Sequence, residues 1–196
     1  TRIKNIFIPS KTTKIGHDAF KNSSLEKVEF ASNSKLKTID STAFERTHIK
    51  SISIPLSVEN IKIMAFYNSS LGRVDIPENS KLEIIADMVL ASTLIESIFI
   101  PKNIKCIECG AFNECYLLKN VEIPKDSKLQ TIKKRAFNES KIECLTIPSD
   151  VSYLKEGWCS GTNNLTKLIV MPNNKHFMFF DSKLIVGKTD ISKDEY

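Results

Sequence analysis

A short motif recurs along this chain of 196 residues at nearly constant intervals, and this repetition constrains the fold more than any other feature. Five Ala-Phe pairs share one register, and Val89-Leu90 and Gly157-Trp158 fill the two gaps in the series. The second residues of successive pairs are separated by 24, 22, 24, 22, 25 and 21 residues, which makes the unit a doublet of about 46 residues. The five pairs are Ala19-Phe20, Ala43-Phe44, Ala65-Phe66, Ala111-Phe112 and Ala136-Phe137.

A second motif precedes each pair and predicts a short strand. In Ile98-Phe99-Ile100-Pro101 the two isoleucines recur with period two, and the proline ends the strand because it cannot donate to a ladder. One coil of about 23 residues cannot bury its own apolar side chains, so near-identical coils must stack into a solenoid. The long coils contain extra polar residues, such as Asn79–Lys81, which we interpret as a wider surface turn.

The combined pattern resembles the BspA-like class of leucine-rich repeats, and the segment from Ala111 to Leu118 fits it most closely. The resemblance covers residues 1 to about 172. It implies an α/β fold, a right-handed horseshoe solenoid. About eight short strands would form a concave parallel sheet, with short strand or helical-turn segments on the convex side. It also implies adhesion and binding to host or matrix, as in surface antigens of bacteria and protist parasites.

The last part of the chain departs from the repeat, so we divide the chain into residues 1–172 and residues 173–196. Residues 177–180 and 183–186 are apolar except for Lys183 and flank a tight turn at Asp181-Ser182, which predicts a β-hairpin. A solenoid must cover its open end, so we interpret the hairpin as a cap. The polar residues after Gly187 are expected to form a frayed tail.

The outward residues of the strands, on the concave face of the expected horseshoe, form the predicted ligand-binding surface, because solenoids commonly bind partners on their concave face. Acidic residues recur there in alternate coils, and exposed aromatic residues are common interface anchors. The alternative is a solvated sheet face whose charges only pair locally. The candidate residues are Phe7, Lys27, Glu29, Ser53, Arg73, Asp75, Phe99, Asn120, Glu122, Thr146 and Lys167.

The charge balance indicates which partners to expect. The chain carries 28 basic and 23 acidic residues, a net charge of +5 that is evenly spread, so we expect no nucleic acid as partner. No apolar run is long enough to span a bilayer, so we expect no membrane insertion of this segment. A protein or glycoconjugate remains the expected partner. Because the chain begins with Thr1 and not Met, we expect it to be a piece of a longer protein.

The sequence contains no pattern that favours catalysis. It lacks phosphate-binding glycine loops and His-Glu-x-x-His, and His17, His48 and His176 lie in unrelated registers. Acidic residues two strands apart would be separated by about 10 Å, slightly too wide for a glycosidase pair. We therefore predict a protein that is not an enzyme and that needs no cofactor.

The five cysteines are too few and too scattered for a disulfide framework. Cys106-x-x-Cys109 has the spacing of metal ligands, but no second ligand pair follows, so we predict no metal site and leave a disulfide between the two open. Cys115 is expected to fill a small space in the core, and Cys144 to be exposed and reactive.

Four Asn-x-Ser/Thr sequences are candidate glycosylation sites and suggest a cell-surface or extracellular location, with a cytoplasmic location as the alternative. Each lies at a coil corner, where turns favour Asn and Ser in any case. We predict an adhesion or recognition module, with an intracellular interaction scaffold or a structural spacer as alternatives. The candidate asparagines are Asn22, Asn68, Asn138 and Asn164.

Overall fold

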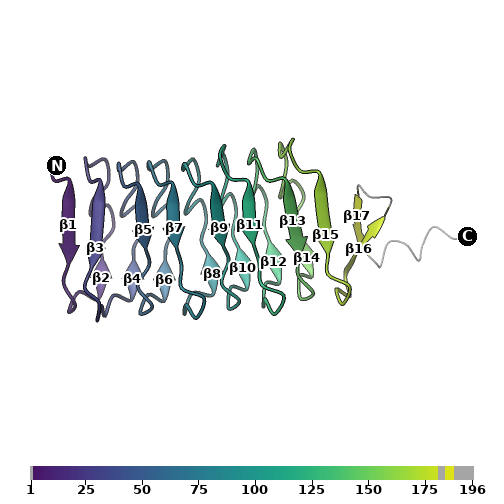
Figure 1. Cartoon of the computed structure of the whole chain (residues 1–196), viewed down its shortest axis with the longest axis horizontal. Coiled ribbons are helices and arrows are strands. Elements are labelled where there is room, and N and C mark those ends of the chain that lie inside the picture. The colour runs from purple at the N-terminus through teal and green to yellow at the C-terminus, as the bar shows by residue number, and fades with distance from the viewer. Residues whose placement is uncertain (1, 181–183, 188–196) are drawn as a thin grey trace, which may run out of the picture.

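The chain is a solenoid of about eight coils in which each coil passes through three walls (Figure 1). The structure is a computed structural model that describes residues 2–180 and 184–187. The first wall consists of the longer strands, the second wall of two-residue strands, and the third wall of the turns that contain the Ala-Phe pairs. A β-hairpin follows the last coil.

All strands of the two β-walls run parallel to their hydrogen-bonded neighbours in adjacent coils. The first wall contains β1 (Asn5–Ile8), β3 (Lys27–Phe30), β5 (Ser51–Ser53), β7 (Arg73–Asp75), β9 (Ser97–Phe99), β11 (Asn120–Glu122), β13 (Cys144–Ile147) and β15 (Lys167–Val170). The second wall contains β2 (Lys14–Ile15), β4 (Thr38–Ile39), β6 (Asn60–Ile61), β8 (Ile84–Ile85), β10 (Cys106–Ile107), β12 (Thr131–Ile132) and β14 (Tyr153–Leu154). The hairpin consists of β16 (Phe177–Phe180) and β17 (Leu184–Gly187).

Equivalent apolar side chains form continuous columns between the walls, as the repeat predicts. The rings of Phe20, Phe44 and Phe66 stack with centroids 5.3 and 5.4 Å apart, and those of Phe112 and Phe137 stack at 5.2 Å. Such offset ring pairs contribute about 0.5–1.5 kcal/mol each beyond the burial of their surface. Leu90, the residue that replaces Phe in the repeat, is buried between the two stacks.

The third wall contains no helix in the described residues, so the predicted helical turns and the α/β class are wrong. Eleven non-glycine residues have φ between 48° and 58°, and every one lies in this wall. Each is two positions before or after the residue at the phenylalanine position of the Ala-Phe pair in its coil. Right- and left-handed residues therefore alternate, and every second N–H points at the next coil. Phe44 N, for example, donates to Ala65 O at 2.8 Å. These intercoil bonds offset a conformational cost of about 1–2 kcal/mol per left-handed residue.

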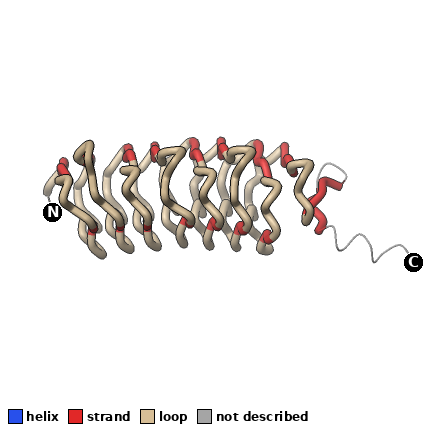
Figure 2. Tube along the Cα trace, turned by 90° about the horizontal axis from the view of Figure 1, so that it is seen from below, coloured by secondary structure: helices blue, strands red, loops and turns tan. Residues whose placement is uncertain are grey.

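The coils follow one another along a nearly straight axis, so the predicted concave horseshoe is not observed (Figure 2). A horseshoe requires wider spacing between coils on one side than on the other. Here backbone hydrogen bonds join neighbouring coils on all three walls, which imposes nearly the same spacing of about 4.8 Å on each. The first wall is therefore close to flat.

The 46-residue doublet of the sequence corresponds to a doublet in the hydrogen bonding. The first wall divides into the ladders β1-β3, β5-β7 and β9-β11-β13-β15, although neighbouring strands lie side by side across each division. Both divisions follow a long coil, and the ladder after the third long coil joins only Asn120 to Cys144. The first-wall ladder is thus interrupted or weakened after each long coil.

The sequence suggested that the inserted turns are surface features, but part of each turn is buried. Ser80 and Ser127 are almost fully buried, and each hydroxyl accepts a hydrogen bond from a backbone N–H two residues later, at 3.2 Å. The N–H groups belong to Leu82 and Leu129, whose side chains enter the core. The insertion is therefore a turn that is closed by serine and anchored by leucine.

The last coil has a different register from the one that the sequence suggested. Phe137 N donates to Trp158 O at 2.8 Å in the same way that Phe112 N donates to Ala136 O. Trp158 therefore occupies the alanine position and Cys159 the phenylalanine position, with Gly157 and Gly161 in the two left-handed positions. The indole packs edge-on against Phe137, at 6.3 Å between ring centroids. The sequence match was misleading because Trp158 is aromatic, like the phenylalanine of the motif, but lies one position before the phenylalanine position.

A chain of ion pairs crosses three coils of the second wall. The Asp40 carboxylate forms ion pairs with Lys14 Nζ at 2.5 Å and with Lys62 Nζ at 3.1 Å. It also accepts a hydrogen bond from the backbone N–H of Ser41 at 2.9 Å. These bonds, above all the one from Lys14, hold the pKa of Asp40 well below its usual value. The carboxylate therefore remains charged in the folded protein under conditions in which the unfolded chain takes up a proton.

Truncation of a column ring should be strongly destabilising. Phe112 is fully buried, so Phe112→Ala should lower the free energy of unfolding by about 3–5 kcal/mol, measured by urea denaturation. Phe7 is 59% exposed, and Phe7→Ala is the matched control, with an expected effect within about 0.5 kcal/mol. Equal losses in the two variants would contradict the column as the source of stability.

The Asp40 network should give a defined pH dependence. A depressed pKa in the folded state contributes stability above the unfolded value near 3.9, and that contribution is lost as the pH falls further. Asp40→Asn should therefore be less stable than the natural chain at pH 7, and the difference should shrink below pH 4 in denaturation curves. Asp126→Asn, which removes an exposed carboxylate with one partner, should show a smaller difference at pH 7.

Candidate functional site: a groove on the first wall

The outward residues of the first wall lie in the two stripes that the sequence predicts. Within the ladders, Phe7 is beside Glu29, Ser53 beside Asp75, and Phe99 beside Glu122. In the second stripe Lys27 is beside Asn5, and Arg73 beside Ser51. The side chains of this face are thus presented at the regular spacing of a parallel sheet.

Two of the three acidic residues of this face form ion pairs on their own strand. Lys27 Nζ lies 2.5 Å from Glu29 Oε1, and Arg73 Nε lies 2.8 Å from Asp75 Oδ1. The other Asp75 oxygen accepts a hydrogen bond from Ser53 at 3.2 Å. These pairs agree with a solvated face whose charges pair locally. Glu122 forms no ion pair in the described part of the chain.

A groove of about 550 Å³ lies on this face, where strands β7 and β9 are not joined by a ladder. Its floor is formed by Val74, Ile76 and Ile98, which are mostly buried. The structure brings five of the eleven predicted residues together on its walls, namely Arg73, Asp75, Phe99, Asn120 and Glu122. The other six lie outside the groove: Phe7, Lys27, Glu29, Ser53, Thr146 and Lys167.

Sequence reasoning missed two residues of the groove, Glu78 and Ser97. Glu78 follows the strand-ending Pro77 in a long coil, and the sequence signal that could have identified it is the insertion itself. Glu78 and Glu122 form no ion pair in the described residues, whereas Asp75 is neutralised by Arg73. The groove is therefore locally acidic on a chain whose net charge is +5.

The cysteines are all free thiols in the structure, so the disulfide that the sequence left open between Cys106 and Cys109 is not formed. Cys106 donates to Glu108 Oε1 at 3.4 Å, and burial with this contact raises the pKa of its thiol to about 12. Cys115 is fully buried and donates to Leu90 O at 3.1 Å, as expected for a core residue, and burial raises its pKa to about 11. Cys144 is exposed on the first wall, as expected.

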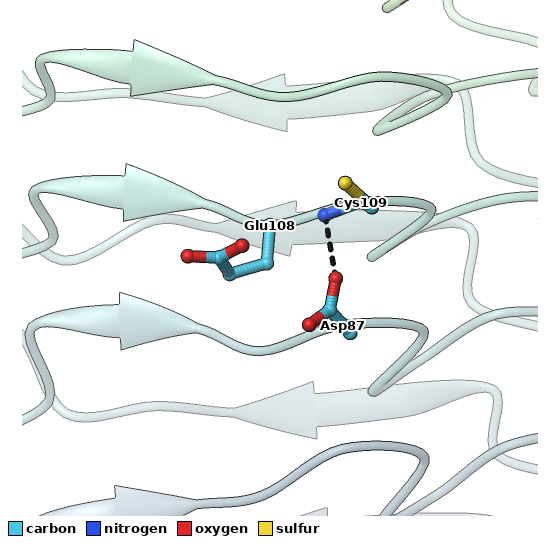
Figure 3. A group of neighbouring side chains, drawn as sticks. All are labelled: Asp87, Glu108 and Cys109. Carbon is cyan, nitrogen blue, oxygen red and sulfur yellow. Dashed lines mark hydrogen bonds between the residues drawn. The ribbon is translucent and has the colours of Figure 1, made fainter.

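One group of potential metal ligands lies on the second wall, at Asp87, Glu108 and Cys109 (Figure 3). Their ligand atoms lie within 4.8 Å of one another. Each carboxylate already has a donor, because Asp87 accepts from Cys109 N at 3.0 Å and Glu108 pairs with Lys133 at 2.5 Å. These contacts account for the arrangement without a metal ion.

The four candidate glycosylation sites differ in accessibility. Asn22, Asn68 and Asn164 are exposed. Asn138 is half-buried, and its side-chain amide donates to Asn113 Oδ1 at 2.8 Å. Modification of the first three is thus sterically open, whereas Asn138 would have to give up a hydrogen bond.

The fold and its flat, polar sheet face define a class of protein, the leucine-rich-repeat solenoids. The chain belongs to the family of the BspA type leucine rich repeat region, whose profile matches six copies over residues 1–103 and 83–186. The resemblance that the sequence suggested is therefore confirmed. Comparison with curated protein sequences finds no match.

Solved structures from three bacteria have the same fold. The pneumococcal vaccine antigen PcpA matches with a TM-score of 0.74 at 24% identity, over 95% of this chain and 45% of that protein. A leucine-rich repeat protein from Bacteroides ovatus matches with a TM-score of 0.64 at 23% identity, over 88% and 62%. A leucine rich cell surface protein from Faecalibacterium prausnitzii matches with a TM-score of 0.61 at 20% identity, over 96% and 52%. The chain thus spans about half to three-fifths of their lengths.

Membership of this leucine-rich-repeat family indicates a protein-binding or recognition module. Leucine-rich repeats of this kind are typically not enzymes. Within the described residues there is no helix of the length and hydropathy needed to cross a bilayer.

The rim of the groove should be dispensable for folding. The side chains of Arg73 and Asp75 are 74% and 44% exposed, so Arg73→Ala should change the free energy of unfolding by less than about 1 kcal/mol. Ile98, in the floor, is 3% exposed, and Ile98→Ala should cost about 2–5 kcal/mol in the same urea titration. A large loss from Arg73→Ala would mean that the rim is structural.

Proposed function

We propose that the protein is a non-enzymatic recognition module that binds a protein or glycan on a cell or matrix surface through the groove between β7 and β9. The observation that carries this proposal is the meeting of Phe99, Asn120, Glu122 and the Arg73–Asp75 pair around one concavity. The proposal places the site on a flat sheet face and not on a concave one.

The composition of the groove suits recognition. An apolar floor with a polar rim is the usual anatomy of a binding interface. Phe99 is half-buried, so part of its ring remains available as an anchor for an apolar group or the face of a sugar. The Asn120 amide can donate and accept hydrogen bonds, and the Arg73–Asp75 pair presents a fixed donor and a fixed acceptor.

The size of the groove limits what it can hold. A volume of about 550 Å³ lies in the range of small-ligand sites, of the order of 300–1,000 Å³. This is enough for two or three side chains of a partner protein or for a short oligosaccharide. A larger partner would also contact the two outward stripes of the neighbouring strands.

An extracellular or cell-surface location is part of the proposal. It is supported by the family and by the descriptions of two similar structures, a vaccine antigen and a cell surface protein. The exposed Asn22, Asn68 and Asn164 provide a direct readout, because glycans at these positions require passage through a secretory route. Mass spectrometry of the native protein should find glycans at these sites. Bare asparagines would instead favour the intracellular scaffold.

Binding should depend on the groove. The chain would be applied to printed arrays of glycans and purified extracellular-matrix proteins, and the strongest hit would be measured by biolayer interferometry. The variant Phe99→Ala with Asn120→Ala and Glu122→Gln should bind that hit at least about tenfold more weakly, because it loses the anchor and two polar contacts.

The matched control keeps the same chemistry but acts outside the groove. Phe7→Ala with Asn5→Ala and Glu29→Gln changes the same three residue types at an equivalent position of the first wall. This control should bind as the natural chain does. If the groove variant binds normally while both variants remain folded, the groove is not the recognition site.

A further inference from the structure

A second concavity lies away from the first wall, at the corner where the second wall turns into the third in the last two coils. It has a volume of about 340 Å³. One coil contributes Lys134, Arg135 and Asn138, which lie in the segment after β12. The next coil contributes residues that follow β14, namely Lys155, Glu156, Gly157 and Ser160.

The charges around this concavity depart from the pattern of the second wall. At two places on this wall, equivalent positions in adjacent coils carry opposite charges that form ion pairs, Asp40–Lys62 and Glu108–Lys133. The backbone register then places Lys155 beside Lys133, because Lys133 N donates to Ile107 O and Lys155 N to Ile132 O. Two cations thus occupy neighbouring equivalent positions, and like charges at that spacing repel.

The cations that line the concavity have no acidic partner of their own. Lys134, Arg135 and Lys155 are exposed, and none forms an ion pair in the described part of the chain. The neighbouring Lys133 is held by Glu108 at 2.5 Å. Glu156 is the only carboxylate in the lining, so the lining has a net charge of +2 when its three cations and one anion are counted.

The other groups in the lining also favour an anion. Ser160 offers an exposed hydroxyl, and Arg135 presents a planar fork of donors that matches the oxygens of a tetrahedral anion. The lining contains no aromatic residue on which a nucleic-acid base could stack.

We infer that this corner is a second binding site, which takes a sulfate or phosphate group carried by a larger ligand. The three cations lie within one small concavity and not along an extended stripe, so the site suits a single oxyanion group. The site lies on other walls than the groove between β7 and β9, and the inference does not depend on the function proposed for that groove.

The test uses the intact chain in solution at low ionic strength. Inorganic sulfate and inorganic phosphate would be titrated separately while backbone amide resonances are recorded by NMR. Saturable shifts should be centred on residues 134–138 and 155–160. Dextran sulfate and uncharged dextran, and vesicles of phosphatidylcholine with and without a phosphoinositide, would then distinguish a sulfated polysaccharide from a lipid phosphate as the source of the group.

The test variant is Lys134→Gln with Arg135→Gln and Lys155→Gln. It should bind the preferred anion at least about tenfold more weakly, which corresponds to about 1.4 kcal/mol. Lys119→Gln with Lys125→Gln and Lys128→Gln removes the same charge from exposed lysines outside the concavity and should bind as the natural chain does. Thermal unfolding would verify that both variants are folded.

Two outcomes would overturn the inference. Equal weakening in both triple variants would mean that only overall charge attracts the anion. Shifts that do not saturate, or that are centred elsewhere while the chain is folded, would mean that the corner is not a site.

Discussion

Every part of this structure depends on the hydrogen bonding of each coil to a near-copy of itself. No coil has an interior of its own, and the aliphatic and aromatic residues are buried only because equivalent residues lie above and below them. The third wall makes the dependence plain, because its alternating left-handed residues are unfavourable in isolation and are offset only by the bonds to adjacent coils. Stability in such a fold is shared between neighbours and is not located in one centre.

The sequence was sufficient to predict the repeat, the strands and the family, because all three are carried by periodicity. The columns of Phe and Ile, the prolines that end strands and the terminal hairpin lie where the pattern placed them. The form of the third wall could not be predicted in the same way. A segment such as Thr42–Arg46 contains no glycine that would indicate left-handed residues in the sequence. Its left-handed backbone is imposed only by the neighbouring coils. The predicted curvature was wrong for a related reason, since curvature depends on how the spacing between coils differs from one wall to another.

The candidate site was predicted only in part, and the reason is again physical. Periodicity identifies which residues point outward, but it treats all coils alike. The groove lies where β7 and β9 do not form a ladder, after the long coil that contains the insertion following Pro77. Phe99 and Phe7 hold the same register position, yet only Phe99 lies in the groove. Both proposed binding sites therefore lie where the repeat is irregular, at the groove and at the basic corner beside Lys155.

The doublet of long and short coils has a consequence for how proteins of this type can grow. Because the first-wall ladder is interrupted or weakened after each long coil, the interruptions recur at every second coil, about 10 Å apart. Duplication of one doublet would preserve the phase of all three walls and add one more interruption at the same interval. In a lengthened molecule the interruptions of the first-wall ladder would therefore recur at a constant interval. A polymeric ligand whose own repeat matches that interval could contact several of them at once.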